Sequence, residues 1–386
     1  MSLLNYAIIK DMYFCIPSGI VVNMKLSKQL FFFILLLSST WLSAQVKFVN
    51  EFLNIGVGAR ALSMSGSVTA SCSDGSATYW NPANLSAINA PLEFNAMHAN
   101  WFGGIANYDY LALAKRVNQE KNGYFGLSMI RLGIDNIPNT LNLVGPDGSI
   151  DFDRVTTFSA ADYGFFLSYG QEIKSNFKAG GNVKVIHRTI GTFGASWGFG
   201  ADLGLTLVAG HFTFSAMARD ITTTFNTWSF NLSEEEKKVF LATGNDVPLS
   251  STELTLPRII FGTAYKFDKG NFSGLAEVDL NISTDGRRAA IISGNRFTID
   301  PTFGFEIGYA KRVYLRGGIG NLQRIINLQN ASTNTFDFQP NVGLGLGLGR
   351  LRIDYALANV GNVSGVLASH IFSASLRFAE KNKNNN

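Results

Sequence analysis

The feature that most constrains this sequence is a long series of segments in which apolar and polar residues alternate. Within residues 272–282 the even positions are apolar or small, whereas Glu277, Asp279 and Asn281 hold odd positions. Successive side chains of a β-strand point to opposite faces, so this alternation predicts strands with one apolar and one polar face. The same pattern recurs at 197–207 and 351–357. We therefore expect an all-β protein.

Fourteen segments fit this pattern, and many have about ten residues, the length that a tilted strand needs to cross a bilayer. The predicted strands are 91–101, 107–117, 122–132, 160–171, 176–189, 196–208, 211–220, 257–267, 271–282, 301–311, 312–323, 337–349, 350–359 and 367–378.

The connections between these strands sort into two kinds. Every second connection is a short turn, whereas the long ones are 133–159, 221–256, 283–300 and 324–336. Short turns at one end and long loops at the other are typical of outer-membrane barrels. The sequence thus predicts a 14-stranded antiparallel transmembrane β-barrel over 91–378, with a secreted all-β protein as the alternative. Outer-membrane lipid would surround the apolar face.

Composition agrees with this prediction. The 386 residues include 39 Gly, 31 Phe, 12 Tyr and 5 Trp, which suits short strands with aromatic outer faces. The formal net charge of +4 is too balanced to indicate nucleic acid as a partner.

The beginning of the chain predicts export. Residues 24–44 have the basic start, apolar centre and small-residue end of a signal peptide, with cleavage after Ala44, and 1–23 form an upstream extension outside the mature protein. Cys72 is then the only cysteine of the mature chain. These features predict the outer membrane of a Gram-negative bacterium as the location. Residues 379–386 form a polar tail.

Between the signal peptide and the first strand, residues 45–90 are predicted to form a hatch inside the lumen. Residues 54–85 are rich in glycine and small residues, and Pro82 restrains Asn81 to an extended or turn conformation. A flexible linker is the alternative, but the segment is too apolar for one. Glycines at 343, 345, 347 and 349 leave an inner wall bare, against which such a segment could press.

Inward-facing charges of both signs are predicted to form a network that holds the hatch, in preference to a substrate path. Arg60 and Asp74 would be the contributions of the hatch, since a partly buried charge needs a partner. The predicted hatch and lumen network comprises Arg60, Asp74, Asn81, Pro82, Asp202, Glu277, Asp279 and Arg352.

Two long loops carry apolar residues that could bind a partner or fold over the barrel mouth. The predicted partner-binding positions are Ile137, Leu141, Leu143, Trp228, Phe230, Val239 and Phe240. Ser233 and Glu236 have capping-box spacing, which predicts a short helix beginning at Ser233.

Catalysis finds little support in the sequence. His98, His187, His211 and His370 lie on separate predicted strands, and no zinc-protease HExxH motif occurs. We expect no enzyme activity, no catalytic residue, no metal and no cofactor.

The run from Gly56 to Ser86 resembles the start of the PorV/PorQ family of outer-membrane proteins, which serves the type IX secretion system and is related to the FadL transporters. The residues that carry the resemblance are Gly58-Ala59-Arg60-Ala61, Asp74, Ala77 and Asn81-Pro82-Ala83. The resemblance implies a 14-stranded barrel with a hatch that binds secreted cargo or secretion components through its loops.

The alternative is a FadL-like channel that admits hydrophobic small molecules. Such a channel would need an apolar pocket in the barrel mouth, and it would bind a hydrophobic ligand there.

Overall fold

The computed structural model describes residues 49–144, 149–284, 290–294, 296–326, 334–358 and 368–379. The predicted upstream extension and signal peptide, and residues 380–386 of the predicted tail, lie outside the described residues. Strands make up most of the structure. They are β1 (Leu92–Trp101), β2 (Ala106–Asn118), β3 (Gly123–Asn139), β4 (Thr156–Lys174), β5 (Phe177–Ile190), β6 (Gly194–Ala209), β7 (Phe212–Arg219), β8 (Thr224–Phe230), β9 (Thr252–Thr255), β10 (Arg258–Lys269), β11 (Phe272–Ser283), β12 (Ile292–Ser293), β13 (Thr298–Tyr309), β14 (Val313–Ile326), β15 (Asn334–Leu348), β16 (Leu351–Ala358) and β17 (Ser369–Phe378).

The helices of the described residues are short. They are η1 (Glu51–Asn54), α2 (Ala59–Ser63), α3 (Ala77–Trp80), η2 (Pro82–Ala87), η3 (Phe102–Gly104), η4 (Phe152–Arg154) and α4 (Glu234–Ala242). None of these helices combines the length and apolarity that crossing a bilayer requires.

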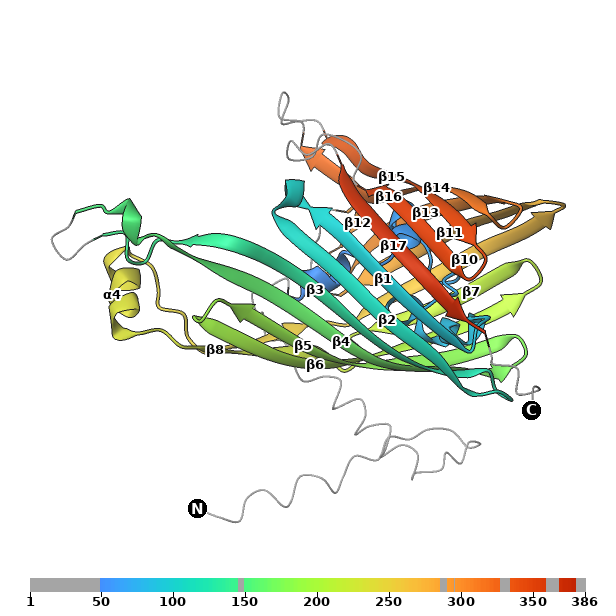
Figure 1. The fold of residues 1–386 in the computed structure, drawn as a ribbon, viewed down its shortest axis with the longest axis horizontal. Helices are drawn as coiled ribbons and strands as arrows, with labels where there is room; N and C mark the ends of the chain where they lie inside the picture. Colours follow the sequence, from blue (N-terminus) through green and yellow to red (C-terminus); the bar gives the residue numbers. More distant parts are fainter. Residues whose placement is uncertain are drawn as a thin grey trace, which may run out of the picture. The chain divides into compact units, whose positions relative to one another are not determined.

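The 17 described strands form one antiparallel sheet that closes on itself, because β1 pairs with β2 on one side and with β17 on the other (Figure 1). Strands β8, β9 and β12 extend the sheet locally, and the remaining 14 form the closed wall. Each of the fourteen predicted ranges overlaps one wall strand, although residues 359 and 367 of two ranges lie outside the described residues, so the predicted 14-stranded antiparallel barrel is confirmed. Closure removes the exposed edges that an open sheet would leave.

The short connections are tight turns, as predicted. Gly210, between β6 and β7, has φ 61°, and Gly270, between β10 and β11, has φ 60°. This left-handed conformation carries no steric penalty for glycine, so the chain can reverse within two residues.

Two of the predicted long connections contain further strand. Strands β3 and β4 continue past a register shift between Ile134 and Ile137, so that Ile137 pairs with Phe158. Asn136 lies inside this shift with φ 59°. The bulge moves every following side chain to the opposite face, which hides the alternation from a simple period-two search. The loop prediction for 133–139 and 156–159 was therefore wrong.

The prediction of a loop over 221–256 was also wrong in part. Both β7 and β8 pair with β6. Strand β8 therefore continues along β6 beyond the end of β7, and residues 220–223 only break the strand between them. Across from this interruption, Leu256 and Pro257 separate β9 from β10. Proline cannot donate to a ladder hydrogen bond, which accounts for the break on this side.

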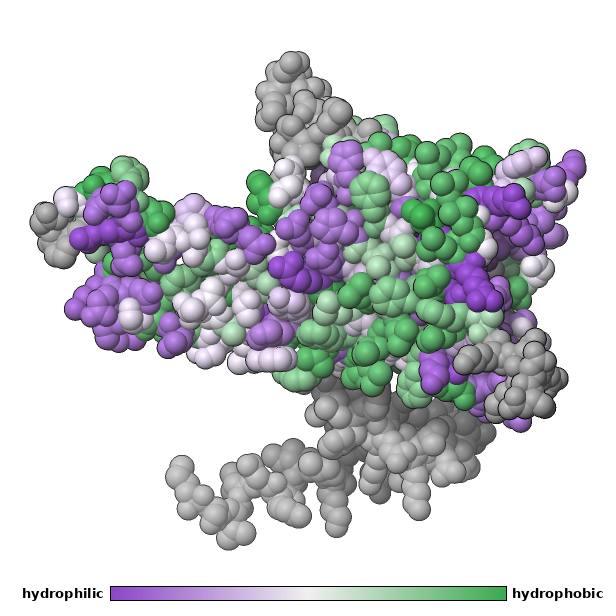
Figure 2. All heavy atoms as spheres, in the orientation of Figure 1, coloured by the Kyte–Doolittle hydropathy of each residue, from purple (hydrophilic) through white to green (hydrophobic). Residues whose placement is uncertain are grey.

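The outer face of the wall is apolar, as the alternation predicted. On β6, Trp197 is 52% and Leu203 52% exposed, whereas Asp202 between them is 3% exposed. On β15, Val342, Leu344, Leu346 and Leu348 all point outward and are exposed. Figure 2 shows hydrophobic residues gathered over the strands and hydrophilic residues toward their ends. This distribution matches that of barrels that span a bilayer.

Candidate functional site

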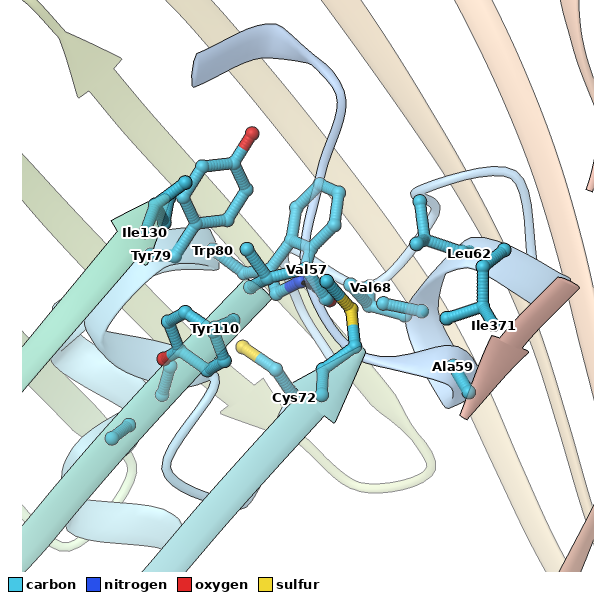
Figure 3. Packing of buried hydrophobic residues seen from close by; sticks show 14 of the residues in the cluster. Val57, Ala59, Leu62, Val68, Cys72, Tyr79, Trp80, Tyr110, Ile130 and Ile371 are labelled. Atoms are coloured by element: carbon cyan, nitrogen blue, oxygen red, sulfur yellow. Dashed lines mark hydrogen bonds between the residues drawn. The ribbon is translucent and has the colours of Figure 1, made fainter. Parts of the chain in front are cut away.

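Residues 49–90, termed here the N-terminal segment, are packed against the inner face of the wall. Their apolar side chains form one buried cluster with inward-facing residues of the first and last wall strands and of β11, and Figure 3 shows Tyr79, Trp80 and Val57 beside Tyr110 of β2. Tyr79 and Trp80 meet edge to face with ring centroids 4.8 Å apart. The segment therefore supplies the core that the barrel interior would otherwise lack, because the outward side chains of the wall face away from it.

Wall glycines allow this close packing. A Cβ on Gly318 would lie 2.4 Å from the backbone carbon of Met64, and one on Gly343 would lie 2.5 Å from Cβ of Ser63. At Gly170 and Gly180 the added atom would meet the backbone of Pro82. Glycine at 343 thus provides the bare wall that the sequence predicted. Gly345 of the same glycine row differs from Gly343. A Cβ on Gly345 would meet Arg316 and Asp354 of the wall, not the N-terminal segment.

Arg60 joins the N-terminal segment to a charge network in the lumen. Its Nε lies 2.9 Å from Oε2 of Glu306, which also pairs with Arg316 and Arg352. Both arginines pair in turn with Asp354. Burial alone would lower the pKa of Arg60, but the Glu306 carboxylate more than offsets this and raises the pKa, so Arg60 stays charged.

Asp74 has a local role. It accepts hydrogen bonds from the backbone N–H and the hydroxyl of Ser76, at 2.9 and 2.5 Å, just before α3. This is an Asx-type turn, the usual use of an aspartate at such a position. In the described contacts Asp74 therefore orders the segment itself, and Arg60 makes the ion pair with the wall.

Glu277 and Asp279 bind the backbone of the N-terminal segment. Glu277 accepts a 2.6 Å hydrogen bond from Ala70 N–H, and Asp279 accepts one of 3.1 Å from Thr69 N–H. Both side chains are 1% exposed. These two predicted network residues thus satisfy backbone groups that have no strand partner.

Asp202 belongs to a separate cluster at the interruption between β7 and β8. Lys184 Nζ lies 2.8 Å from Asp202 and 2.6 Å from Asp220, and Asp202 also accepts a hydrogen bond from the Asp220 N–H. Asn182 links this cluster to the segment, since its amide donates to Thr78 O at 2.7 Å. The cluster fixes the backbone where the ladder breaks.

Asn81 and Pro82 position the last helix of the segment. The Asn81 amide donates to Thr69 O at 3.0 Å and to Thr206 Oγ1 of β6 at 3.1 Å, and its Oδ1 accepts from Ala83 N–H at 3.1 Å. Pro82 occupies the first position of η2, where its fixed φ suits a helix start. Asn81 is fully buried, so all of its polar atoms need such partners.

The single cysteine of the described chain is inaccessible. Cys72 is 2% exposed and accepts a 3.3 Å contact from the Asn84 amide. Burial raises the pKa of its thiol to about 12.

The predicted partner-binding residues are divided among different elements. Ile137 lies in β3 and both Trp228 and Phe230 lie in β8, so these three are strand residues. Val239 and Phe240 lie in α4, whose N-terminus has the predicted capping box between Ser233 and Glu236. The remaining two positions, Leu141 and Leu143, are half-buried in the turn after β3.

A cavity of about 600 Å³ lies between the N-terminal segment and one end of the barrel. Leu62, Tyr79 and Trp80 of the segment form part of its lining. The cavity also touches the final residues of β1, β7, β11 and β16, so it lies at the end where the long connections begin. Much of its wall carries neutral polar side chains: Asn281, Ser283, Thr298, Thr302, Gln323, Gln339 and Asn341.

Arg219, the last residue of β7, was not singled out from the sequence. It lines the cavity, is 8% exposed, and lies over the Tyr79 ring at 4.3 Å from the ring centroid. Its Nη1 and Nη2 donate to the hydroxyl and the carbonyl oxygen of Tyr79, at 3.1 and 3.3 Å. The available sequence signal was a cation at an inward-facing strand end, which is common at barrel rims and therefore weak.

These features define the class of protein: a closed, antiparallel, 14-stranded β-barrel with a polypeptide segment packed inside it. The chain is similar in structure to the P. putida toluene transporter TodX, with TM-score 0.53, 14% identity, and coverage of 84% of this chain and 99% of that chain. The CymD monoaromatic hydrocarbon channel gives 0.52 and 12%, covering 84% and 98%. A Pseudomonas aeruginosa FadL homologue gives 0.50 and 11%, covering 83% and 97%.

At these identities the likeness concerns the fold. The chain matches no protein-family model, and no curated protein matches its sequence significantly. The similar structures include a FadL homologue and give no support to the narrower PorV/PorQ assignment.

Proposed function

We propose that this protein is an outer-membrane channel of a Gram-negative bacterium that admits small, largely hydrophobic molecules. The observation that carries the proposal is the cavity of about 600 Å³ at the long-connection end of a barrel whose outer face is apolar. Ligand pockets commonly measure roughly 300–1,000 Å³ and combine apolar surface with a few polar groups.

The similar solved structures support this function over a role in secretion. They include a toluene transporter and a monoaromatic hydrocarbon channel, which are barrels that handle small hydrophobic molecules. The cavity of this chain differs from the apolar pocket expected of such a channel, because polar side chains line much of its wall. A passenger with both an apolar body and a polar group suits this lining.

In this proposal the N-terminal segment acts as the hatch. The cavity ends on Leu62 and Trp80, so a molecule can continue through the lumen only when part of the segment moves. The Arg60–Glu306 ion pair and the hydrogen bonds from Thr69 and Ala70 to the wall resist that movement.

Uptake of toluene by intact cells tests the channel. Cells that express the protein should accumulate radiolabelled toluene faster than cells with an empty vector. Asn281→Trp places a large side chain in the cavity and should abolish the gain. Leu280→Trp is the matched control, because Leu280 is the preceding residue of β11 and points outward, 40% exposed. Equal uptake through both folded variants would contradict the proposal.

Binding of secreted cargo or type IX secretion components remains a second candidate function. The specific observation in its favour is the excursion between β8 and β9, in which the capped helix α4 carries Leu241 and is followed by Leu249, 66% and 78% exposed. Affinity purification from solubilised outer membranes should recover secretion components with the wild type and lose them when α4 is deleted. Recovery of none with either protein would exclude this role.

A further inference from the structure

The lining of the cavity is rich in side-chain carboxamides. Six of its residues carry one: Asn54, Asn281, Asn321, Gln323, Gln339 and Asn341. A carboxamide is uncharged and offers two N–H donors and an acceptor oxygen. A hydroxyl group likewise donates and accepts, so carboxamides and hydroxyl groups are well matched as partners.

Three polar side chains of the lining are free to bind an occupant. Asn281 and Ser283 of β11 and Gln339 of β15 make no side-chain hydrogen bond to the described part of the chain. The Asn341 amide, by contrast, donates to Ser65 Oγ at 2.6 Å. Asn281 and Gln339 are half-buried, so an occupant of the cavity displaces the water beside them. A purely apolar occupant would leave these groups unpaired, which costs free energy.

The polar and apolar parts of the lining come from different parts of the chain. Most of the carboxamides lie on β11, β14 and β15, which follow one another around the wall with only β12 and β13 between them (Figure 1). The N-terminal segment contributes Ile55, Leu62 and Trp80, and Trp101 is added by the end of β1. The cavity can therefore bind a molecule that has both an apolar body and a polar portion.

The charges in the lining are balanced. Two arginines and two carboxylates contribute, so their formal charges sum to zero: Arg219, Arg258, Glu51 and Asp300. Asn54 bridges one pair of them, because its Oδ1 accepts from Arg258 Nη1 and its Nδ2 donates to Glu51 Oε2, both at 2.9 Å. A charged occupant would lose its hydration without meeting an excess of opposite charge. The lining therefore favours an uncharged occupant.

We propose that the cavity binds an uncharged molecule in which a hydrophobic ring carries a hydroxylated portion, as in an aryl glycoside. Asn281 and Gln339 bind the hydroxyl groups, and the apolar side chains of the N-terminal segment contact the ring. This inference rests on the proposed channel function and names the substrate class for its cavity. It accounts for the polar wall, which a channel for hydrocarbons alone does not need.

The test uses three probes that share a phenyl group on a six-membered oxygen ring. Phenyl β-D-glucoside carries hydroxyl groups, 2-phenoxytetrahydropyran carries none, and phenyl β-D-glucuronide adds a carboxylate. Fluorescence of the purified, detergent-solubilised protein reports binding, because Trp80 and Trp101 both line the cavity. The wild type should bind the glucoside at least tenfold more tightly than the glucuronide, since the carboxylate must be desolvated.

Asn281→Leu removes a carboxamide and keeps the size of the side chain. The affinity for the glucoside relative to 2-phenoxytetrahydropyran should fall about tenfold, as expected when one or two hydrogen bonds are lost. Comparing this ratio between variants cancels the partition of each probe into detergent. Gln339→Met should lower the ratio as well, and it carries the test where Asn281→Leu fails to fold, as judged by heat-modifiable mobility on gels.

Asn107→Leu is the matched control. Asn107 points outward from β2 and does not line the cavity, so the ratio should stay at the wild-type value. A ratio that fell equally in Asn107→Leu would show an effect unrelated to the cavity and would overturn the inference.

The outcomes separate this inference from the channel itself. An unchanged ratio in folded Asn281→Leu and Gln339→Met, or equal affinity of the wild type for glucoside and glucuronide, would overturn the proposed substrate class. Toluene uptake would still support the channel in that case. Equal toluene uptake through Asn281→Trp and Leu280→Trp would overturn the channel, whatever the three probes do.

Discussion

Arg60 in α2 lies 2.9 Å from Glu306 in β13, measured from Nε to Oε2, and this pair joins the N-terminal segment to the wall. The two side chains are only 11% and 14% exposed, so neither charge is well solvated. Glu306 also serves two wall arginines, which makes it the common acceptor of the network.

Arg60→Ala should loosen the segment. Removing one member of a buried pair costs about 3–5 kcal/mol, because the remaining charge loses its partner. We expect higher single-channel conductance and a lower unfolding temperature in detergent. Arg188→Ala, which removes a pair within the wall, should leave the conductance unchanged. Unaltered conductance and stability in Arg60→Ala would show that other contacts hold the segment.

Gly318→Ala should displace α2 from the wall. The new methyl carbon would lie 2.4 Å from the Met64 backbone, which cannot move as freely as a side chain tip. Overpacking of this kind costs about 1–3 kcal/mol. Gly133→Ala is the control, since its methyl would meet the flexible guanidinium of Arg131. Protease cleavage within residues 49–90 should increase in the first variant only.

Cys72 should be unreactive in the folded protein. With a thiol pKa of about 12, only about one molecule in ten thousand carries the thiolate at pH 8, against roughly a quarter for an ordinary cysteine. Labelling with N-ethylmaleimide should therefore require unfolding in hot detergent. A Ser250→Cys variant in a Cys72→Ser background should label readily, because Ser250 is exposed. Rapid labelling of native Cys72 would show that the segment opens.

Leu127→Arg should prevent stable insertion in lipid. Leu127 points outward from β3 and is 59% exposed, within the apolar band. Arginine at the middle of the band costs about 2–4 kcal/mol, and near the membrane edge about 0–1. Asn107→Arg, toward the long-connection end of β2, should therefore fold nearly as well as the wild type. Equal folding yields of the two variants in vesicles would argue against a lipid-facing band.

The wall could be predicted well from the sequence because the alternation of apolar and polar residues shows which side chains point outward and which point into the lumen. The strands around Asp202 and Glu277 appear where the pattern placed them, with both residues inward. The pattern failed at Ile137, where a bulge inverted the alternation. It also failed at Trp228, because the strand that pairs with β6 is broken into β7 and β8.

The interior was predictable only in part. Arg60 pairs with Glu306 of the wall, in keeping with the need of a buried charge for a partner, whereas Asp74 accepts a hydrogen bond from Ser76 within the segment. Arg219 went unnoticed, since its importance depends on Tyr79 and the cavity, which are brought together only by the folded chain.

The pairing of β1 with β17 has a consequence for assembly. The first and last wall strands form the seam of the barrel, and the N-terminal segment precedes both in the chain. Since the segment packs against the inside of strands on several sides of the wall, we expect it to enter the nascent barrel before β1 pairs with β17. A barrel that closed first would then have to admit the segment through one of its ends.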